Sequence, residues 1–355
     1  MKRRENMGLL AAALIALLLA VTAVGLVRWH NSLLNRHTNL QQLQDLPAGT
    51  RVHLLAQVTY IDARGKRFWV EDETGAAPVP VDPAAAHVHA GENVIVSAVK
   101  AGHYDPLQGP ASYNLEQVVV KPTSADVKLP LPGVADLDNF PAPEKNGQRV
   151  TMQAIVREFQ IDPQGYPTLI VGKSGYPVGV IVPPPTGDLT SLVDASVTIT
   201  GIPEQQRDAQ RRIIASNLWV PSWNDVRVES PAPVSVPLRD IRSLYRDPTD
   251  GHRVRVRGLV GRVNAGSLLL EDASGAIECQ TTGAPAVQVG SAIEATGFPA
   301  HDGMRIDLYN AAVSPIDPAL LAPSIAPSEP VLTTAQSVRQ LSPERAALAL
   351  PVHVT

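Results

Sequence analysis

The residues of this chain that have catalytic chemistry do not have the spacing of a known catalytic site. The segment Gly172-Lys173-Ser174 is similar to the end of a phosphate-binding loop, but that loop needs a glycine five positions before Gly172, where this chain has Pro167. The acidic pairs Glu71-Asp72 and Glu271-Asp272 occur at matching places in a repeated pattern. Recurrence at a turn favours a structural role over acid–base catalysis, so no catalytic residue is predicted here, and an enzyme with an unrecognised site is the least favoured hypothesis.

Metal and thiol chemistry are also weakly represented. One loose cluster has metal-ligating side chains, formed by His87, His89, His103 and Asp105, and its spacing matches no standard zinc site. Solvated loop histidines are the expected explanation, and neither a metal nor a cofactor is predicted. The single cysteine, Cys279, cannot form an intrachain disulfide and is expected to be a small buried apolar residue.

Two adjacent aromatic residues offer a speculative binding site. Phe68 and Trp69 lie in a strand-like run and could stack on the rings of a ligand. Aromatic residues make up only 4% of the chain and the net charge is −4. An arginine-rich strand at residues 253–262 is expected to be a charged, solvated face. This composition and an exported location argue against nucleic acid as a partner.

A repeat of about a hundred residues organises the chain. Each copy opens with Gly-x-Arg-Val, beginning at Gly49, Gly147 and Gly251. A turn follows at a matching position, which reads Asp-x-Ser/Thr-Gly in the first and third copies and is more divergent in the second, at residues 171–175. Aspartate and glycine at such positions suit a tight hairpin. Each copy is therefore expected to be a unit of domain size.

The pattern within each copy predicts five short strands. Val254, Val256 and Val260 alternate with arginines, as in a strand that has one buried and one solvated face. A small residue recurs in the middle of this first strand, where it permits a bulge or a sharp bend. Ala56, Ala154 and Gly258 occupy that position. The predicted fold class is all-β, with tandem five-stranded Greek-key barrels of the OB-fold type, three complete and a fourth begun. Short helices are expected before two of the units, around residues 238–245 and 335–345.

The N-terminus contains a long apolar segment. Residues 7–27 carry no charge and, as a helix, would match a hydrocarbon core of about 30 Å. Basic residues at 2–4 place the N-terminus in the cytoplasm and the barrels outside it, by the positive-inside rule. The expected location is the inner membrane, crossed once, with periplasmic or extracellular barrels. A cleaved signal peptide is the alternative, and it is disfavoured by the length of the apolar run.

These patterns divide the chain into ten segments. The boundaries are a cytoplasmic tail (1–6), a transmembrane helix (7–28), a juxtamembrane stalk (29–45), barrel 1 (46–122), a Pro-rich linker (123–144), barrel 2 (145–231), a linker (232–247), barrel 3 (248–316), a Pro-rich linker (317–334) and the start of a fourth module (335–355). Because the last segment resembles the first strand of a further copy, the sequence is expected to be a C-terminally truncated part of a longer protein.

Three motifs carry a resemblance to a known family. They are Gly-x-Arg-Val-x-Val-x-Gly at 251–258, Leu-Leu-Leu-Glu-Asp-Ala-Ser-Gly-Ala-Ile at 268–277 and Ala-Thr-Gly-Phe-Pro-Ala at 295–300. Together they resemble the tandem OB-type modules in the extracytoplasmic part of bacterial membrane sensor proteins. The resemblance covers about residues 46–355. It implies a second membrane helix and a histidine kinase or nucleotide cyclase beyond them, and the present sequence contains neither.

The resulting functional hypothesis is a membrane-anchored extracytoplasmic sensor region, as the N-terminal part of a two-component sensor histidine kinase. The alternative is a non-catalytic cell-envelope adaptor built from OB-fold modules. A third hypothesis, an exported nucleic-acid-binding protein, is disfavoured. The expected partners are membrane lipid through the N-terminal helix, a small-molecule, glycan or protein ligand of unknown identity, and a second copy of the chain in a homodimer.

Overall fold

The computed structural model describes most of the chain between residues 37 and 354. The described residues are 37–62, 64, 66–102, 115–137, 140, 147–173, 175, 177–185, 187–207, 213–246, 251–302, 305–321, 331–340 and 352–354. The chain divides into two compact units, residues 1–130 and residues 131–355, and each is described by itself. The predicted transmembrane helix at 7–28 lies outside the described residues. Within the described ranges, no helix combines the length and apolar character needed to span a bilayer.

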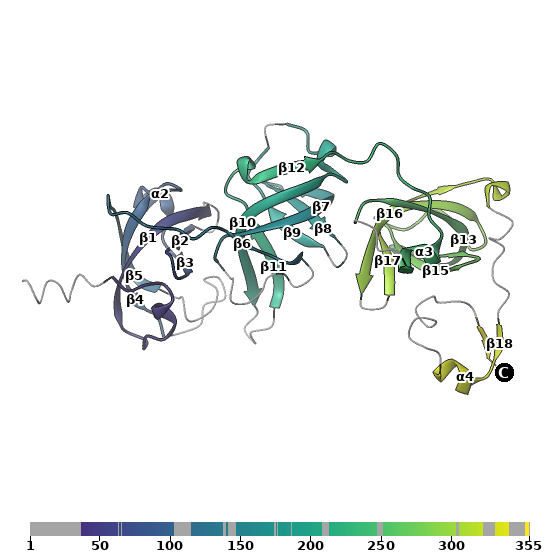
Figure 1. Cartoon of the computed structure of the whole chain (residues 1–355), viewed down its shortest axis with the longest axis horizontal. Coiled ribbons are helices and arrows are strands. Elements are labelled where there is room, and N and C mark those ends of the chain that lie inside the picture. Colours follow the sequence, from purple (N-terminus) through teal and green to yellow (C-terminus); the bar gives the residue numbers. More distant parts are fainter. Residues whose placement is uncertain are drawn as a thin grey trace, which may run out of the picture. The chain divides into compact units, whose positions relative to one another are not determined.

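The first unit contains barrel 1. Its strands are β1 (Arg51–Asp62), β2 (Arg67–Glu71), β3 (Ala76–Val79), β4 (Asn93–Lys100) and β5 (Leu115–Pro122), and they pair in the order β3-β2-β1-β4-β5. The 3-10 helix η1 (Gln42–Gln44) precedes β1, and the short helix α2 (Pro83–Ala86) lies between β3 and β4 (Figure 1). Alternate residues of β1 and β4 form the core of this barrel, together with Leu40 and Leu43 from the segment around η1.

Barrel 2 begins the second unit and has two additional strands. Its elements are β6 (Gly133–Val134), β7 (Val150–Ile161), β8 (Pro167–Gly172), β9 (Val178–Ile181), η5 (Thr190–Leu192), β10 (Ser196–Arg207), β11 (Ile213–Trp219), η6 (Trp223–Asp225) and β12 (Val226–Ser230). Strands β7-β8-β9-β11-β10 form a ring that the β10–β7 pairing completes, while β6 pairs with β7 and β12 pairs with β10.

Barrel 3 is a closed five-stranded barrel in the same unit. Its elements are α3 (Ile241–Arg246), β13 (Val254–Asn264), β14 (Ser267–Asp272), β15 (Gly275–Gln280), β16 (Ala292–Asp302), β17 (Arg305–Pro315) and η7 (Pro318–Leu320). The strand order is β13-β14-β15-β17-β16, in which β15 and β17 are parallel and every other pairing is antiparallel. This order is that of an OB-fold, and it confirms the prediction of all-β, five-stranded barrels.

The C-terminal pieces of the described chain are short. They are β18 (Val331–Thr333), α4 (Ala335–Arg339) and β19 (Val352–Val354), and β18 pairs with β19 in parallel. The helix predicted around 238–245 is present as α3, and the one predicted from residue 335 begins there as α4.

The first strand of each copy follows the predicted alternation and carries the predicted irregularity. In barrel 3, Val254, Val256 and Val260 are at most 1% exposed and belong to the core. The pairing of the first strand with the second shifts register in every copy, between the second and fourth residues after the recurrent small residue. The shifts lie at Val58/Tyr60, Val156/Glu158 and Val260/Arg262. In barrel 3, a Cβ added at Gly258 would lie 2.2 Å from the carbonyl oxygen of Glu271, so β14 approaches too closely for a larger residue.

The recurrent turn of barrels 1 and 3 binds the segment that precedes the barrel. In barrel 3, Asp272 Oδ1 accepts hydrogen bonds from the Ser274 and Gly275 amides, and Oδ2 accepts one from the Ile241 amide at 2.9 Å, at the start of α3. Asp72 repeats this geometry in barrel 1, where its Oδ2 accepts from the Leu40 amide at 2.8 Å. The predicted tight turn is therefore present, and it also fastens the chain before strand 1 onto the barrel.

Barrels 2 and 3 contact each other within their unit through two buried charged residues. Asp194, 1% exposed, accepts hydrogen bonds from the Arg253 amide and Arg253 Nε, both at 3.1 Å, and lies 3.0 Å from His252 Nδ1. Arg157 is fully buried, and its guanidinium donates to three carbonyl oxygens, those of Lys173, Gly175 and Pro299. These bonds connect strand 1 and the hairpin turn of barrel 2 to barrel 3.

Candidate ligand-binding face of the third barrel

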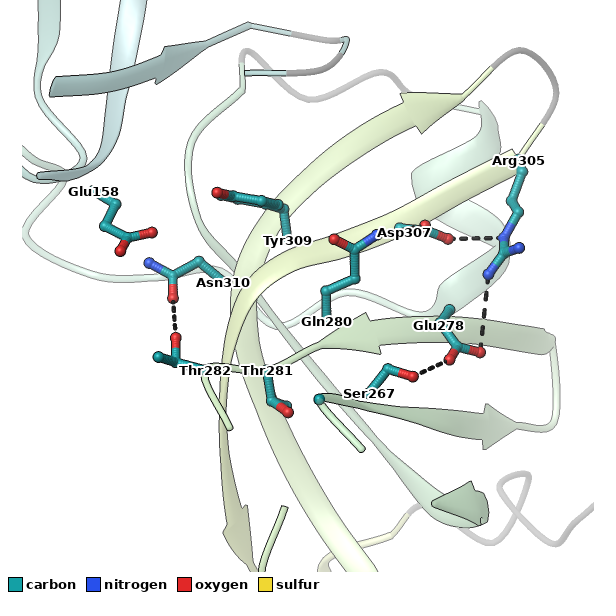
Figure 2. A pocket seen from close by; sticks show the side chains of 11 residues that line it. Glu158, Ser267, Glu278, Gln280, Thr281, Thr282, Arg305, Asp307, Tyr309 and Asn310 are labelled. Atoms are coloured by element: carbon teal, nitrogen blue, oxygen red, sulfur yellow. Dashed lines mark hydrogen bonds and ion pairs between the residues drawn. The ribbon is translucent and has the colours of Figure 1, made fainter. Parts of the chain in front are cut away.

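The outer face of barrel 3 contains an open, polar hollow of about 510 Å³. It lies over strands β14, β15 and β17, which are strands 2, 3 and 5 of the OB-fold order. Gly266 in the turn between β13 and β14 lies at one edge, and Glu158 of β7 in barrel 2 also contributes. Figure 2 shows the lining side chains. The polar residues of barrel 3 that line it are Ser267, Glu278, Gln280, Thr281, Thr282, Arg305, Asp307, Tyr309 and Asn310.

Strand alternation explains why these side chains share one face. In β17, Ile306 and Leu308 point into the core and are at most 1% exposed, so Arg305, Asp307 and Tyr309 point outward. In β15, Ile277 and Cys279 belong to the core, and Glu278 and Gln280 alternate with them on the outer face. The parallel register sets Glu278 beside Asp307, which brings the two outward rows together.

Glu278 is held by three neighbours in the wall of the hollow. Its carboxylate accepts hydrogen bonds from Ser267 Oγ at 2.5 Å and from Arg262 Nη2 at 2.9 Å. Arg305 Nη2 lies 3.8 Å away (Figure 2). Glu278 is only 9% exposed, so these bonds fix its oxygen atoms before any ligand arrives.

Asp307 is the second buried carboxylate of this face. It is 9% exposed, accepts a hydrogen bond from Gln280 Nε2 at 2.9 Å, and lies 2.8 Å from Arg305 Nε. The contact with Arg305 is an ion pair without hydrogen-bond alignment, so Oδ1 of Asp307 is a buried acceptor without an aligned donor among the described residues. A ligand hydroxyl in the hollow could supply that donor.

Tyr309 and Asn310 form the other end of the hollow. Burial raises the pKa of the Tyr309 hydroxyl, and the nearby charge of Glu158 raises it further, while Arg157 lowers it. Tyr309 therefore stays neutral at physiological pH and keeps an O–H donor. Asn310 has a left-handed backbone, with φ of 50°, and its Oδ1 accepts a hydrogen bond from Thr282 Oγ1 at 3.2 Å.

The arrangement presents fixed polar groups that can bind a ligand. Within the hollow, the carboxylates of Glu278 and Asp307 are both ion-paired, and the Ser267 hydroxyl donates a hydrogen bond to Glu278. The face presents hydroxyl, amide, carboxylate and guanidinium groups in fixed positions, together with one half-buried aromatic ring. When Glu158 of barrel 2 is included, the lining contains three carboxylates and one guanidinium, so its net charge is negative.

The residues predicted to stack on a ligand lie elsewhere and are not exposed. Phe68 is fully buried in the core of barrel 1, and Trp69 on the opposite side of β2 is 1% exposed. Arg67 lies over the Trp69 ring at 5.9 Å from its centroid. Phe68 and Trp69, the speculative ligand-binding pair, are therefore both buried in this structure, and neither ring is exposed for stacking on a ligand.

Other candidate residues have structural roles. The arginines of β13 form ion pairs across the sheet, as expected for a solvated charged face: Arg257 Nε lies 2.7 Å from Glu294 on β16, its direct partner in the register. Cys279 is fully buried, and burial raises its thiol pKa far above the usual range, as do the charges of Glu278 and Asp307. Among the described residues, no group of acidic, histidine or cysteine side chains could hold a metal ion, and His103 and Asp105 lie outside them.

The residues of the hollow were missed by sequence reasoning because no motif contains them. The sequence feature that could have indicated them is a polar residue at every second position of strands that are otherwise apolar. Glu278 and Gln280 are two apart in one strand, and Arg305, Asp307 and Tyr309 are two apart in another. Only the pairing of strands 3 and 5 shows that the two sets are adjacent.

Comparisons with known proteins give structural likenesses only. No protein-family model matches the chain, and no curated protein matches it. A replication protein A heterotrimer bound to single-stranded DNA is 10% identical, with 77% of this chain and 94% of that one covered and a TM-score of 0.22. The Ifi202 HINa domain in complex with 20-base-pair double-stranded DNA is 8% identical, with 53% and 99% covered and a TM-score of 0.25.

An aspartyl-tRNA synthetase from Entamoeba histolytica is 16% identical, with a TM-score of 0.22, and the match covers 29% of this chain and 23% of the synthetase. The chain thus spans about a quarter of the length of the tRNA synthetases that it matches. The fold assignment rests on the strand order, and these likenesses add no ligand to it.

The comparisons do correct one prediction about partners. The sequence argued against nucleic acid, but barrel proteins similar to this chain are bound to single-stranded or double-stranded DNA in their structures. Low aromatic content and a net charge of −4 are properties of the whole chain and do not exclude nucleic acid from one face of one barrel. The prediction that nucleic acid is an unlikely partner is therefore withdrawn.

Proposed function

We propose that barrel 3 is a non-catalytic receptor for an uncharged, polar oligosaccharide. The observation that carries this proposal is the position of the polar hollow. It lies on the strand 2–3 face of a closed OB barrel, the face on which such barrels bind oligosaccharides and oligonucleotides.

The chemistry of the lining favours a ligand rich in hydroxyl groups. A sugar hydroxyl donates one hydrogen bond and accepts others, so it can pair with the carboxylates of Glu278 and Asp307 and also with Gln280 and Arg305. The ion pairs with Arg262 and Arg305 already hold these carboxylates in place, which lowers the entropy cost of binding. The Tyr309 ring adds an apolar surface for the C–H face of a sugar.

A matched pair of glutamate variants tests this proposal. Binding of neutral oligosaccharides to the full chain is measured by isothermal titration calorimetry. We expect Glu278→Gln to weaken binding by roughly tenfold or more, since it removes a charged acceptor worth about 1.5–3 kcal/mol. Glu294→Gln is the control, because Glu294 also pairs with arginines in barrel 3 but does not line the hollow. Equal affinities for the two variants, or no saccharide binding at millimolar concentration, would contradict the proposal.

A second candidate ligand is a single-stranded nucleic acid. It is favoured by two arginines at this face, Arg262 and Arg305, whose side chains are 57% and 56% exposed and could reach phosphates. This ligand predicts an affinity that falls steeply with salt and drops further in Arg262→Gln. Saccharide binding predicts little dependence on salt, so titration at two ionic strengths separates the two candidates.

We also propose, from the sequence, that the barrels form the extracytoplasmic region of a membrane-anchored sensor, with a cell-envelope adaptor as the alternative. The support is the apolar segment at 7–28, the tandem barrels and the resemblance to sensor modules. A ligand can transmit a signal only if it binds two conformations with different affinities. Crosslinking in cells distinguishes the alternatives: a dimer of a longer kinase chain supports the sensor, and stable complexes with other envelope proteins support the adaptor.

A further inference from the structure

A second hollow of about 490 Å³ adjoins the first and is lined mainly by barrel 3, with Arg157 and Val193 of barrel 2 also contributing. The two hollows share three lining residues, Thr281, Thr282 and Asn310. These shared residues include the hydrogen-bonded pair Thr282 Oγ1 and Asn310 Oδ1, which Figure 2 shows at one end of the first hollow. Each hollow alone falls within the volume of a pocket for one small ligand, about 300–1,000 Å³.

The second hollow differs from the first in its chemistry. Its lining is largely small and apolar on two sides, from residues 284–286 in the loop after β15 and residues 311–313 in β17. Phe298 lies in its base, with the Arg253 guanidinium 5.8 Å from the centre of the ring. The first hollow, in contrast, contains paired carboxylates, amides and hydroxyls. Together the two surfaces offer hydrogen bonds at one end and contacts for small apolar groups at the other.

We infer that the two hollows form one continuous groove for a linear oligosaccharide whose units bear N-acyl groups. This inference rests on the proposed saccharide-binding function and specifies its ligand. The ring hydroxyls of one part of the chain bind the carboxylates and amides of the first hollow. The acyl methyl groups of the next part pack on the alanines and Phe298 of the second, where an unsubstituted sugar would leave apolar surface without contact.

The length of the ligand is the first test. The full chain is titrated with N-acetylglucosamine oligomers of one to six units and with glucose oligomers of the same linkage and lengths. The groove predicts an affinity that rises at least tenfold from one unit to four and then levels off, with the N-acetylated series binding more tightly. Affinity independent of length, or equal in the two series, overturns the inference and leaves the single-hollow function standing.

A variant that fills only the second hollow is the second test. Ala286 is exposed and lines that hollow alone, so Ala286→Trp blocks it without touching the first. We expect Ala286→Trp to bind the four-unit saccharide only about as tightly as the shortest saccharides. Its affinity for the shortest saccharides should not change. Ala319→Trp is the matched control, because Ala319 is exposed in η7 and lines neither hollow.

The outcomes distinguish failure of the inference from failure of the proposed function. If Ala286→Trp binds the tetramer as tightly as the unaltered chain, the second hollow is not part of the site. If no oligomer binds at all, the saccharide function itself fails, and the groove inference fails with it. The rate at which a thiol reagent labels the buried Cys279 verifies that each variant barrel remains folded.

Discussion

Barrel 2 differs from barrel 3 at two equivalent positions of the repeat, and both differences serve the contact between them. The hairpin turn of barrel 3 contains Asp272, which binds its own preceding helix. The corresponding turn of barrel 2 has no aspartate at this place, and the carbonyls of Lys173 and Gly175 instead accept hydrogen bonds from Arg157. The same turn thus binds the preceding helix in barrel 3, whereas in barrel 2 it lies at the contact with barrel 3.

The second difference lies at the start of strand 4. Barrels 1 and 3 have glycine there, Gly91 and Gly290, with φ of 89° and 82°. Barrel 2 has Asp194 with φ of 73°, a conformation that is costly for a residue with a Cβ. The carboxylate of Asp194 binds His252 and Arg253 at the beginning of barrel 3. Backbone strain in barrel 2 is therefore retained at a residue that contacts its neighbour.

The largest effect is expected for Asp272→Ala. The substitution leaves the buried amides of Ile241 and Gly275 and the Ser274 amide without their acceptor. We expect barrel 3 to lose about 3 kcal/mol of stability, or roughly a hundredfold in its opening equilibrium. The labelling rate of Cys279, the single cysteine, measures this opening in the full chain. Asp317→Ala is the control, since Asp317 caps only the exposed η7; a similar increase in both would mean that the turn has no special role.

The next prediction tests the stability of barrel 2 separately from its contact with barrel 3. Asp194→Gly restores the glycine of the other copies, so we expect it to relieve backbone strain of about 1 kcal/mol in barrel 2. The same change removes the carboxylate that contacts His252 and Arg253 and leaves only the backbone carbonyl of residue 194 beside His252 Nδ1, so trypsin should cut the linker between barrels 2 and 3 several times faster. Hydrogen exchange measures the first outcome and limited proteolysis the second. Unchanged proteolysis would show that Asp194 does not hold the barrels together.

A pair of glycine variants refines the comparison further. Gly49 and Gly251 open their copies with φ of 82° and 89°. A Cβ at Gly49 would meet nothing within 4 Å, whereas one at Gly251 would lie 2.6 Å from the Lys173 carbonyl oxygen. Both alanine variants should lose about 1 kcal/mol from the backbone conformation, and Gly251→Ala should lose more. Equal losses in denaturant unfolding would argue against the close approach of barrel 3 to the turn of barrel 2.

The smallest effect concerns pH. Burial raises the pKa of Tyr245 and Tyr309 in barrel 3 above the ordinary value of a tyrosine. A tyrosine whose pKa is raised by folding contributes stability below its unfolded pKa and loses it as pH rises through the folded pKa. Barrel 3 should therefore lose a little stability above pH 10, and Tyr309→Phe should reduce the loss. Absorbance at 295 nm follows both ionisations; normal titration of both residues would contradict the burial.

The sequence predicted the barrels better than it predicted the site. Alternation of valine and arginine at 254–260 and the recurrent small residue foretold the first strand and its bulge, because both are local consequences of strand geometry. The bonding of Asp272 to an amide 31 residues earlier was not predictable from the turn itself. The hollow depends on the parallel pairing of β15 with β17, a long-range contact that leaves no local signal.

The position of β16 in barrel 3 also has a mechanical consequence. This strand lies between β13 and β17 and is antiparallel to both, so the chain enters β13 at one end of the sheet and leaves β17 at the other. Tension applied along the chain would slide these strands past each other and load many perpendicular hydrogen bonds at once, instead of opening them one by one. We therefore expect barrel 3 to unfold slowly under tension, because the unfolding rate governs how a domain responds to force.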